Sequence, residues 1–385
     1  MKYMMDRAWM EISLDAIEEN YRRVKHDIGD KCRILAVIKA NAYGLGAVYL
    51  AKFLEGLGCE FFAVACIEEA VELRDAGVKG NILTLGPVLP EHLEIACEKD
   101  IITTIISLDH AEKLSARAQQ LGLTIRGHIA ADSGLGRFGL VLEGRVDAAV
   151  DEAAYIAGLP GIKAEGTFTH YTAADLPRGD EFNKHQIGLF DEYTEKLAAR
   201  GLKLTKHSAS SYFTAIYPEC HNDYVRIASL LLGIDAPAPR GTVCEMAVQL
   251  KSRIYQIKEL GPGRPVSYGP IAHTLRRTRI AVVPIGYADG LRRTIQNKAS
   301  LLVNGQWAPI IGKICMDYLM LDVTDIDADE GDDVVVIGRS GDEDLKMYEM
   351  ADLYGATVGE VVTAIAPRIP RFYTRNGEIV GRMDS

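Results

Sequence analysis

Polar side chains directly follow several short apolar segments in the N-terminal part of this chain, and the first of them is a lysine. Lys39 comes after 33–38 (RILAVI), whose β-branched and aliphatic residues are typical of a buried strand. Near a packed interior the charged form of a lysine is unfavourable, because burial lowers its pKa. A neutral lysine amine can form a Schiff base with an aldehyde, although a strand-end lysine more often keeps its ammonium in water.

Eight strand-like segments alternate with helical ones over about 230 residues, which predicts parallel βαβ units. The strand-like segments are 33–38, 61–66, 81–87, 101–105, 123–132, 161–170, 202–210 and 223–229. Eight units at this length favour a (β/α)8 TIM-like barrel over an open sheet. Because barrel enzymes carry their chemistry at the C-terminal ends of the strands, the polar residues found there are expected to share one rim.

The polar residues at or near the ends of the first, fifth, sixth, seventh and eighth strands are Lys39, Arg137, His170, Ser210 with Ser211, and Arg226. A phosphate site in barrels is often built from the loops after strands seven and eight, where Ser211, Ala228 and Ser229 lie. A lysine, a phosphate site and an arginine on one rim suggest pyridoxal phosphate (PLP), which serves as an electron sink for a carbanion.

From about Cys244 the pattern becomes mostly strand-like and predicts a second, mostly β domain. The strand-like segments are 244–257, 278–287, 300–324 and 332–338, with a turn at Asn304-Gly305 and a short helix at 346–353. A proline-rich stretch at 235–240 (DAPAPR) is the predicted boundary between the two domains.

Composition narrows the class of protein. The 385 residues include 43 basic and 53 acidic ones, a net charge of −10, which predicts a soluble protein and argues against nucleic-acid and anionic-membrane binding. Apolar runs fall short of the roughly 20 residues of a membrane span, and the charged N-terminal segment does not resemble a signal peptide. Seven scattered cysteines without a CxxC pair predict a reduced, cytoplasmic protein, and no metal-site spacing is recognised.

Seven motifs in the same order make the chain similar to the alanine racemases, PLP-dependent enzymes with a barrel and a β domain. They are 36–46 (AVIKANAYGLG), 165–175 (EGTFTHYTAAD), 223–229 (DYVRIAS), 266–270 (VSYGP), 283–290 (VPIGYADG), 312–317 (GKICMD) and 368–373 (RIPRFY). The resemblance extends from Trp9 to Tyr373. It implies that the first strand pairs with the β domain, so that 10–238 form the PLP-binding barrel and 1–9 with 239–385 form the mostly β domain.

The resemblance assigns one group of residues to the cofactor. Lys39 matches the Schiff-base lysine, which is also one of two catalytic bases. Tyr43 matches a tyrosine that contacts the phosphate, and Ser211, Ala228 and Ser229 match the phosphate cradle. His170 matches a histidine packed on the pyridine ring, and Arg226 matches the arginine that donates to the pyridine nitrogen. Because a guanidinium is effectively never deprotonated, Arg226 would leave the ring nitrogen unprotonated and so disfavour side reactions such as transamination.

A second group is implied to come from the partner subunit of a homodimer. Tyr268 matches the second catalytic base, and Tyr287 matches a tyrosine lining the substrate site. Met316 and Asp317 match a loop that contacts the substrate carboxylate through its backbone. Arg137 does not belong to this partner group: it follows the fifth barrel strand and matches an arginine that reaches toward the same carboxylate from the barrel. Racemisation needs bases on opposite faces of the substrate Cα, which Lys39 of one chain and Tyr268 of the other would supply.

Three positions depart from the family's pattern. Leu45 stands where a histidine is usual, and Pro367 where a tyrosine near the site is usual. Ala130 stands where many relatives carry a carbamylated lysine whose negative charge holds the arginine matching Arg137. Arg137 must therefore be oriented by something else, for which a chloride ion, a water or another carboxylate are candidates.

The sequence thus predicts a homodimeric, PLP-dependent racemase that interconverts L- and D-alanine and supplies D-alanine for peptidoglycan. One alternative is a racemase of serine or of a broader set of amino acids, which the departures at Ala130 and Pro367 favour. A PLP-dependent decarboxylase fits less well, because such enzymes use an acidic ring partner where this chain has Arg226. A PLP carrier without catalysis is a barrel alone and would leave the predicted β domain unexplained.

Overall fold

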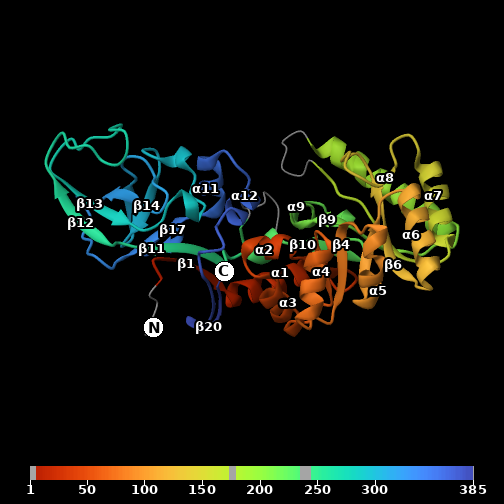
Figure 1. Ribbon diagram of the computed structural model, residues 1–385. Helices are drawn as coiled ribbons and strands as arrows, with labels where there is room; N and C mark the ends of the chain where they lie inside the picture. The colour runs from red at the N-terminus through yellow and green to blue at the C-terminus, as the bar shows by residue number, and fades with distance from the viewer. Residues whose placement is uncertain (1–5, 173–178, 235–243, 385) are drawn as a thin grey trace.

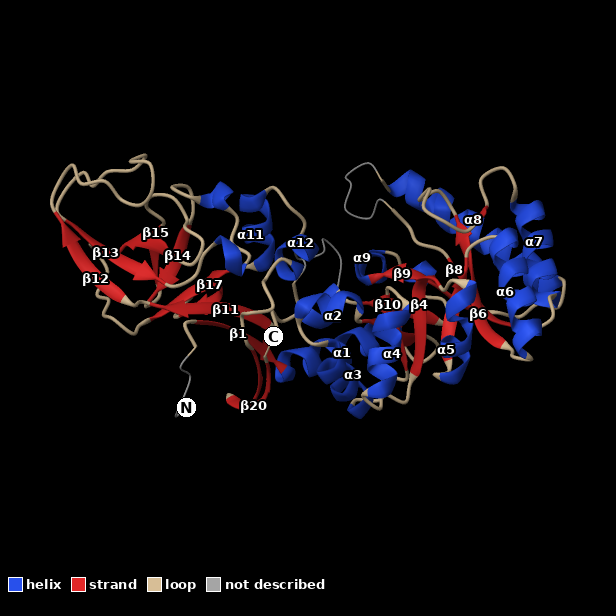
Figure 2. Cartoon of the chain, viewed as in Figure 1, coloured by secondary structure: helices blue, strands red, loops and turns tan. Residues whose placement is uncertain are grey.

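The computed structural model describes residues 6–172, 179–234 and 244–384, which form a barrel and a β domain lying side by side (Figures 1 and 2). The predicted linker at 235–240 lies outside the described residues, and the domain limits predicted from the sequence stay a prediction. Figure 2 shows the red strands of the β domain on one side and the helix-covered barrel on the other, with α2 and α12 between them.

The barrel consists of eight parallel strands in the described residues, as the alternating pattern predicts. They are β2 (Arg33–Val37), β3 (Phe61–Val64), β4 (Asn81–Pro87), β5 (Ile101–Ile105), β6 (Ile125–Asp132), β8 (Ile162–Phe168), β9 (Thr205–Ser210) and β10 (Tyr224–Ile227). The pairings of β10 with β2 and of β5 with β6 close the sheet, and the short β7 (Leu140–Val141) pairs with β6. The predicted barrel is therefore confirmed, and the predicted β domain, described below, accompanies it.

Helices accompany the strands of the barrel. They are α1 (Leu14–Ile28), α3 (Ala47–Gly56), α4 (Ile67–Asp75), α5 (Leu93–Glu98), α6 (Leu108–Leu121), α7 (Val146–Gly158), α8 (Asp180–Ala199), α9 (Ser211–Ile216) and α10 (Ser229–Leu232), with 3₁₀ turns at Pro90–His92 and Pro218–Cys220. The expectations from the sequence did not include α1, although Leu14, Ile17, Tyr21 and Val24 are buried at helical spacing and Ser13 caps its start.

The β domain is built on an eight-stranded sheet in which the N-terminal strand lies centrally. Its members are β1 (Ala8–Ser13), β11 (Val248–Arg253), β14 (Ser300–Val303), β15 (Gln306–Pro309), β17 (Asp333–Ser340), β18 (Glu343–Leu345), β19 (Arg371–Arg375) and β20 (Glu378–Met383). β1 pairs antiparallel with β11 and parallel with β19, so it belongs to the sheet in which the resemblance places it. A three-stranded sheet contains β12 (Gln256–Leu260), β13 (Thr278–Val283) and β16 (Leu319–Asp322).

Two helices and two 3₁₀ turns interrupt the β domain. The helices are α11 (Met347–Tyr354) and α12 (Val358–Thr363), and the turns are Tyr287–Asp289 and Arg293–Ile295. Only α11 was expected, and α12 packs against α2 at the junction with the barrel. A capping box starts α12, because Thr357 accepts a hydrogen bond from the Glu360 amide and the Glu360 carboxylate accepts one from the Thr357 amide.

The chain after β2 makes a left-handed turn that the sequence did not indicate. Within α2 (Lys39–Gly44), the φ angles of Ala40, Asn41, Ala42 and Tyr43 lie between 51° and 57°. Each non-glycine residue in this conformation costs about 1–2 kcal/mol, so surrounding contacts must hold the turn. The turn places Lys39 and Tyr43 together beside the barrel mouth.

Side chains from distant parts of the chain hold this turn. The Glu69 carboxylate on α4 accepts a hydrogen bond from the Ala40 amide at 2.6 Å. From β19, Nε of Arg371 donates to the Gly44 carbonyl at 2.9 Å, and the Tyr373 hydroxyl donates to the Leu45 carbonyl at 2.7 Å. The last strand but one thus stabilises the segment that carries the lysine.

We expect Gly46→Ala to destabilise the protein much more than Gly58→Ala. Both glycines have strongly positive φ angles, +99° and +90°, so alanine at either place costs about 1–2 kcal/mol of backbone strain. A Cβ at Gly46 would also collide with the Tyr373 hydroxyl, whereas nothing lies within 4 Å of one at Gly58. Thermal unfolding of the two variants measures the difference, and equal losses of stability would contradict a close approach of Tyr373.

Candidate active site

A cavity of about 610 Å³ opens at the C-terminal ends of the barrel strands. It brings together eight residues that the sequence assigned to the site, namely Lys39, Tyr43, Arg137, His170, Ser211, Arg226, Ala228 and Ser229. They come from the ends of β2, β6, β8, β9 and β10 and from the loops that follow, so they share one rim, as the positions of the strand ends predict.

Lys39 combines a buried amine with cationic neighbours. Its pKa is lowered chiefly by burial and further by the positive charges of Arg137 and Arg226, while Glu69 acts in the opposite direction. No ion pair with a carboxylate holds its ammonium among the described residues. The amine is therefore easier to deprotonate than that of an ordinary lysine, as its strand-end position suggested.

Arg226 lines the cavity from β10, where both of its terminal nitrogens donate hydrogen bonds. Its Nη2 donates to Nδ1 of His170 and to the carbonyls of Thr169 and Ser208, each at 2.9 Å, and its Nη1 donates to the His207 carbonyl at 2.8 Å. Burial lowers the pKa of Arg226 to about 10, which leaves the guanidinium charged near neutral pH.

The histidine beside this guanidinium is neutral. Burial, followed by the charges of Arg226, Arg137 and Lys39, lowers the pKa of His170 to about 3. Because Arg226 can only donate, Nδ1 of His170 is the acceptor and the proton of the neutral ring lies on Nε2. His170 thus presents an uncharged ring to the cavity.

The loops after β9 and β10 meet at Ser211. Its Oγ accepts a hydrogen bond from the Ala228 amide at 2.9 Å and a longer one from the Leu230 amide at 3.5 Å. Of the charged residues that line the cavity within the described chain, Lys39, Arg137 and Arg226 are cations and Asp352 is a carboxylate. This excess of positive charge beside a deprotonatable lysine fits an anionic aldehyde such as PLP.

The remaining predicted residues lie elsewhere in the chain. Tyr268, Tyr287, Met316 and Asp317 do not line this cavity, and the first three side chains are 70%, 42% and 53% exposed. They gather in the β domain, where the amides of Tyr287 and Ala288 donate to the carbonyls of Cys315 and Met316 at 3.0 Å. A single chain therefore carries two separate groups of predicted site residues.

Several residues of the site were missed by sequence reasoning. Tyr348, Asp352 and Thr357, from α11 and the start of α12, line the cavity of their own chain. Glu69 and Arg371 support the left-handed turn without lining the cavity. A sequence signal existed for Arg371 in the RIPRFY motif, but it does not reveal which backbone carbonyls the arginine contacts.

The three departures from the family pattern occupy different environments. Leu45 is fully buried and Pro367 is exposed, and neither lines the cavity. Ala130 is buried within β6. Arg137 lies over the Phe138 ring, 5.0 Å from its centre, and forms no ion pair with a carboxylate in the part of the chain that the structure describes.

The described residues contain neither a metal-binding cluster nor a membrane-spanning helix. No group of three or more His, Cys, Asp or Glu residues is arranged to hold a metal ion within 6–172, 179–234 and 244–384. Over the same ranges, no helix has both the length and the apolar character needed to cross a membrane.

Comparison with known proteins gives matches over both domains. The alanine racemase N-terminal domain family matches residues 12–236, and the alanine racemase C-terminal domain family matches residues 247–373. An alanine racemase from Clostridium novyi is 34% identical over 379 residues, covering 97% of each chain.

Solved structures of alanine racemases are similar to this chain over nearly its whole length. That of alanine racemase from Clostridium difficile 630 has a TM-score of 0.91 and 34% identity, covering 99% of both chains. That of alanine racemase from Bartonella henselae, with covalently bound pyridoxal phosphate, has a TM-score of 0.86 and 26% identity, covering 96% of this chain and 100% of the other.

We expect Lys39 of the cofactor-free protein to react with amine reagents at lower pH than the exposed Lys52. Because burial lowers the pKa of Lys39, its neutral, reactive form becomes abundant at lower pH. Labelling between about pH 6 and 10, followed by mass spectrometry of each lysine, measures both profiles in one sample. A Lys39 profile at higher pH than that of Lys52 would contradict the described environment.

Proposed function

Given that this chain belongs to the alanine racemase family, and is accordingly a PLP-dependent racemase of alanine, we propose that Lys39 and Tyr268 transfer the Cα proton on opposite faces of the substrate. We further propose that the two residues meet only across a homodimer. The observation that carries this is the separation of the predicted residues, with Lys39 in the barrel cavity and Tyr268 70% exposed in the β domain outside it.

The cavity residues fit the cofactor of the family. When bound, PLP supplies an electron sink that stabilises the carbanion formed at the substrate Cα. Lys39 Nζ would hold it covalently, because the lowered pKa favours a nucleophilic amine. Arg226 would hold the pyridine nitrogen and, as a donor that is not deprotonated, would leave that nitrogen without a proton.

The remaining cavity residues would bind the two ends of the cofactor. The phosphate is assigned to Tyr43, to Ser211 and to the backbone at Ala228 and Ser229, which lie together after β2, β9 and β10. His170, whose neutral ring is fixed by Arg226, would pack against the pyridine ring.

Substrate binding is proposed to use both chains. Arg137 would hold the carboxylate from the barrel side, and the backbone of Met316 and Asp317 from the partner, with Tyr287 lining the site. Alanine is the substrate that the relatives indicate, and D-alanine for peptidoglycan is the proposed use in the cytoplasm. A broader specificity stays the alternative, because Pro367 and Ala130 replace a tyrosine and a lysine that are usual in the family.

We expect inactive Lys39→Ala and inactive Tyr268→Phe proteins to regain activity when their subunits exchange. In a mixed dimer one of the two sites contains neither substitution, because its lysine comes from one chain and its tyrosine from the other. A chiral assay of alanine before and after exchange measures the recovery, and each variant kept alone is the control.

No recovery, with exchange verified by mass spectrometry of differently tagged chains, would mean that Tyr268 acts within its own chain or not at all. The same assay with serine in place of alanine tests the alternative of broader specificity.

We also propose that a chloride ion or ordered water orients Arg137. The Ala130 side chain carries no charge, and no carboxylate of the described chain pairs with this guanidinium. An unpaired cation in a site that closes on dimerisation is unfavourable, so an anion is expected to bind beside it.

We expect activity to fall when chloride is replaced by a bulky anion such as gluconate at constant ionic strength. The loss is expected chiefly in KM, because Arg137 holds the substrate carboxylate in the ground state and the transition state alike. Arg137→Gln serves as the control, since its residual activity should no longer respond to chloride. An unchanged rate of the unmodified protein would count against the ion.

A further inference from the structure

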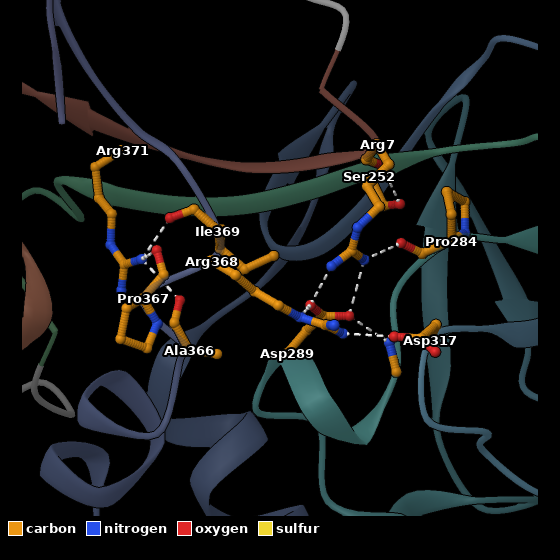
Figure 3. A network of polar contacts seen from close by, with 11 residues as sticks. Arg7, Ser252, Pro284, Asp289, Asp317, Ala366, Pro367, Arg368, Ile369 and Arg371 are labelled. Atoms are coloured by element: carbon orange, nitrogen blue, oxygen red, sulfur yellow. Dashed lines mark hydrogen bonds and ion pairs between the residues drawn. The ribbon is translucent and has the colours of Figure 1, made fainter. Parts of the chain in front are cut away.

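Arg368, on the segment after α12, joins the proposed substrate loop Cys315–Asp317 to a buried carboxylate. Its Nε donates to Oδ1 of Asp289 at 2.8 Å, and its Nη2 donates to Oδ1 of Asp317 at 2.8 Å (Figure 3). Two nitrogens of one planar guanidinium therefore bridge two carboxylates. The single ammonium of a lysine cannot reproduce this fixed spacing.

The Asp289 end of the bridge is a rigid anchor. Asp289 is fully buried, and its carboxylate also accepts from both terminal nitrogens of Arg7, at 2.6 and 3.0 Å, and from the Gly286 amide at 2.9 Å. Burial alone would raise the pKa of this carboxyl, but these hydrogen bonds and charges lower it below its ordinary value. Asp289 therefore stays ionised and fixed, and Figure 3 shows the guanidinium groups of Arg7 and Arg368 both at its carboxylate.

The Asp317 end belongs to an exposed loop. The Asp317 side chain is 44% exposed, and the neighbouring Met316 is 53% exposed. The backbone of this loop is held on one side, where the Cys315 and Met316 carbonyls accept from the 3₁₀ turn Tyr287–Asp289. Arg368 adds a charged side-chain tether at its other end.

The segment that carries Arg368 is itself fixed to the barrel. The guanidinium of Arg371 is buried and donates to four carbonyls of this segment, those of Ile365, Ala366, Pro367 and Ile369. Its Nε donates to Gly44, in the turn that also contains Lys39 and Tyr43. One short segment thus connects the cofactor-side turn with the substrate loop of the same chain.

We propose that Arg368 is a positioning residue for substrate binding, which holds the loop Cys315–Asp317 at a fixed place on the Asp289 anchor. The proposal rests on the proposed role of this loop in binding the substrate carboxylate. Arg368 neither lines the cavity nor contacts the assigned bases, so it acts through the loop Cys315–Asp317 and the Asp289 carboxylate that anchors it.

Substitution of Arg368 is expected to weaken substrate binding more than turnover. Arg368→Gln should raise KM for alanine about tenfold and change kcat less than about threefold, because the loop binds the carboxylate equally in the ground and transition states. Arg368→Lys should give a smaller rise, since lysine keeps the charge but not the bridge. Arg276→Gln is the matched control, because Arg276 pairs with the exposed Asp325 in the same domain.

A measurement without turnover tests the same step. In hydrogen exchange of the holoenzyme, the amides of 315–318 should exchange faster in Arg368→Gln, while those of β13 stay unchanged. Asp317→Asn should reproduce the faster exchange, and the double variant should be no faster than either single variant. An unchanged KM, or unchanged exchange at 315–318, would overturn the proposal, and so would general destabilisation with faster exchange throughout the β domain.

Mixed dimers separate this proposal from that of the shared site. With Lys39→Ala and Tyr268→Phe on different chains, Arg368→Gln should raise KM when placed on the Lys39→Ala chain, which donates its β domain to the active site. On the other chain it should leave KM unchanged, and the reverse result would overturn the proposal. If these dimers stay inactive without Arg368→Gln, the shared site fails, and KM and exchange in the homodimer still decide the role of Arg368.

Discussion

Four successive residues without a glycine, 40–43, adopt a left-handed conformation that L-amino acids disfavour, and the contacts that hold them fix the segment that carries Lys39 and Tyr43. The strain is local, but the groups that compensate it are not. Glu69 comes from α4, and Arg371 and Tyr373 come from the far end of the sequence. The barrel contains the strand β2 that leads into the turn, whereas the β domain contributes Arg371 and Tyr373, which hold the turn in place.

The electrostatics of the cavity follow from the same arrangement. Lys39, Arg137 and Arg226 line one space, and the lowered pKa values of Lys39 and His170 result from burial first and from these like charges second. A buried guanidinium that donates to carbonyls and neutral rings can keep its charge without an acidic partner. Such a site is poised for an anion that also carries an electrophile, which is the combination that PLP offers.

The sequence predicted the barrel strands because their period and their alternation with helices are local properties. It also placed Lys39, His170, Ser211 and Arg226 on one rim, because strand ends in a closed parallel sheet must converge. It could not indicate the left-handed turn, since Ala40 and Ala42 favour ordinary helix and only distant contacts reverse that preference. Nor could it place Arg368, whose two carboxylate partners are 51 and 79 residues away along the chain.

The central position of β1 in its sheet has a consequence for synthesis. This strand is synthesised before the barrel, yet its partners β11 and β19 begin only at Val248 and Arg371. Trp9, Met10 and Ile12 are fully buried in the finished sheet. Until β11 and β19 have been synthesised, this short apolar strand has no hydrogen-bonding partner at either edge. All of the barrel strands, β2 to β10, are therefore synthesised before either partner of β1 exists, so β1 can enter its sheet only after the barrel sequence is complete.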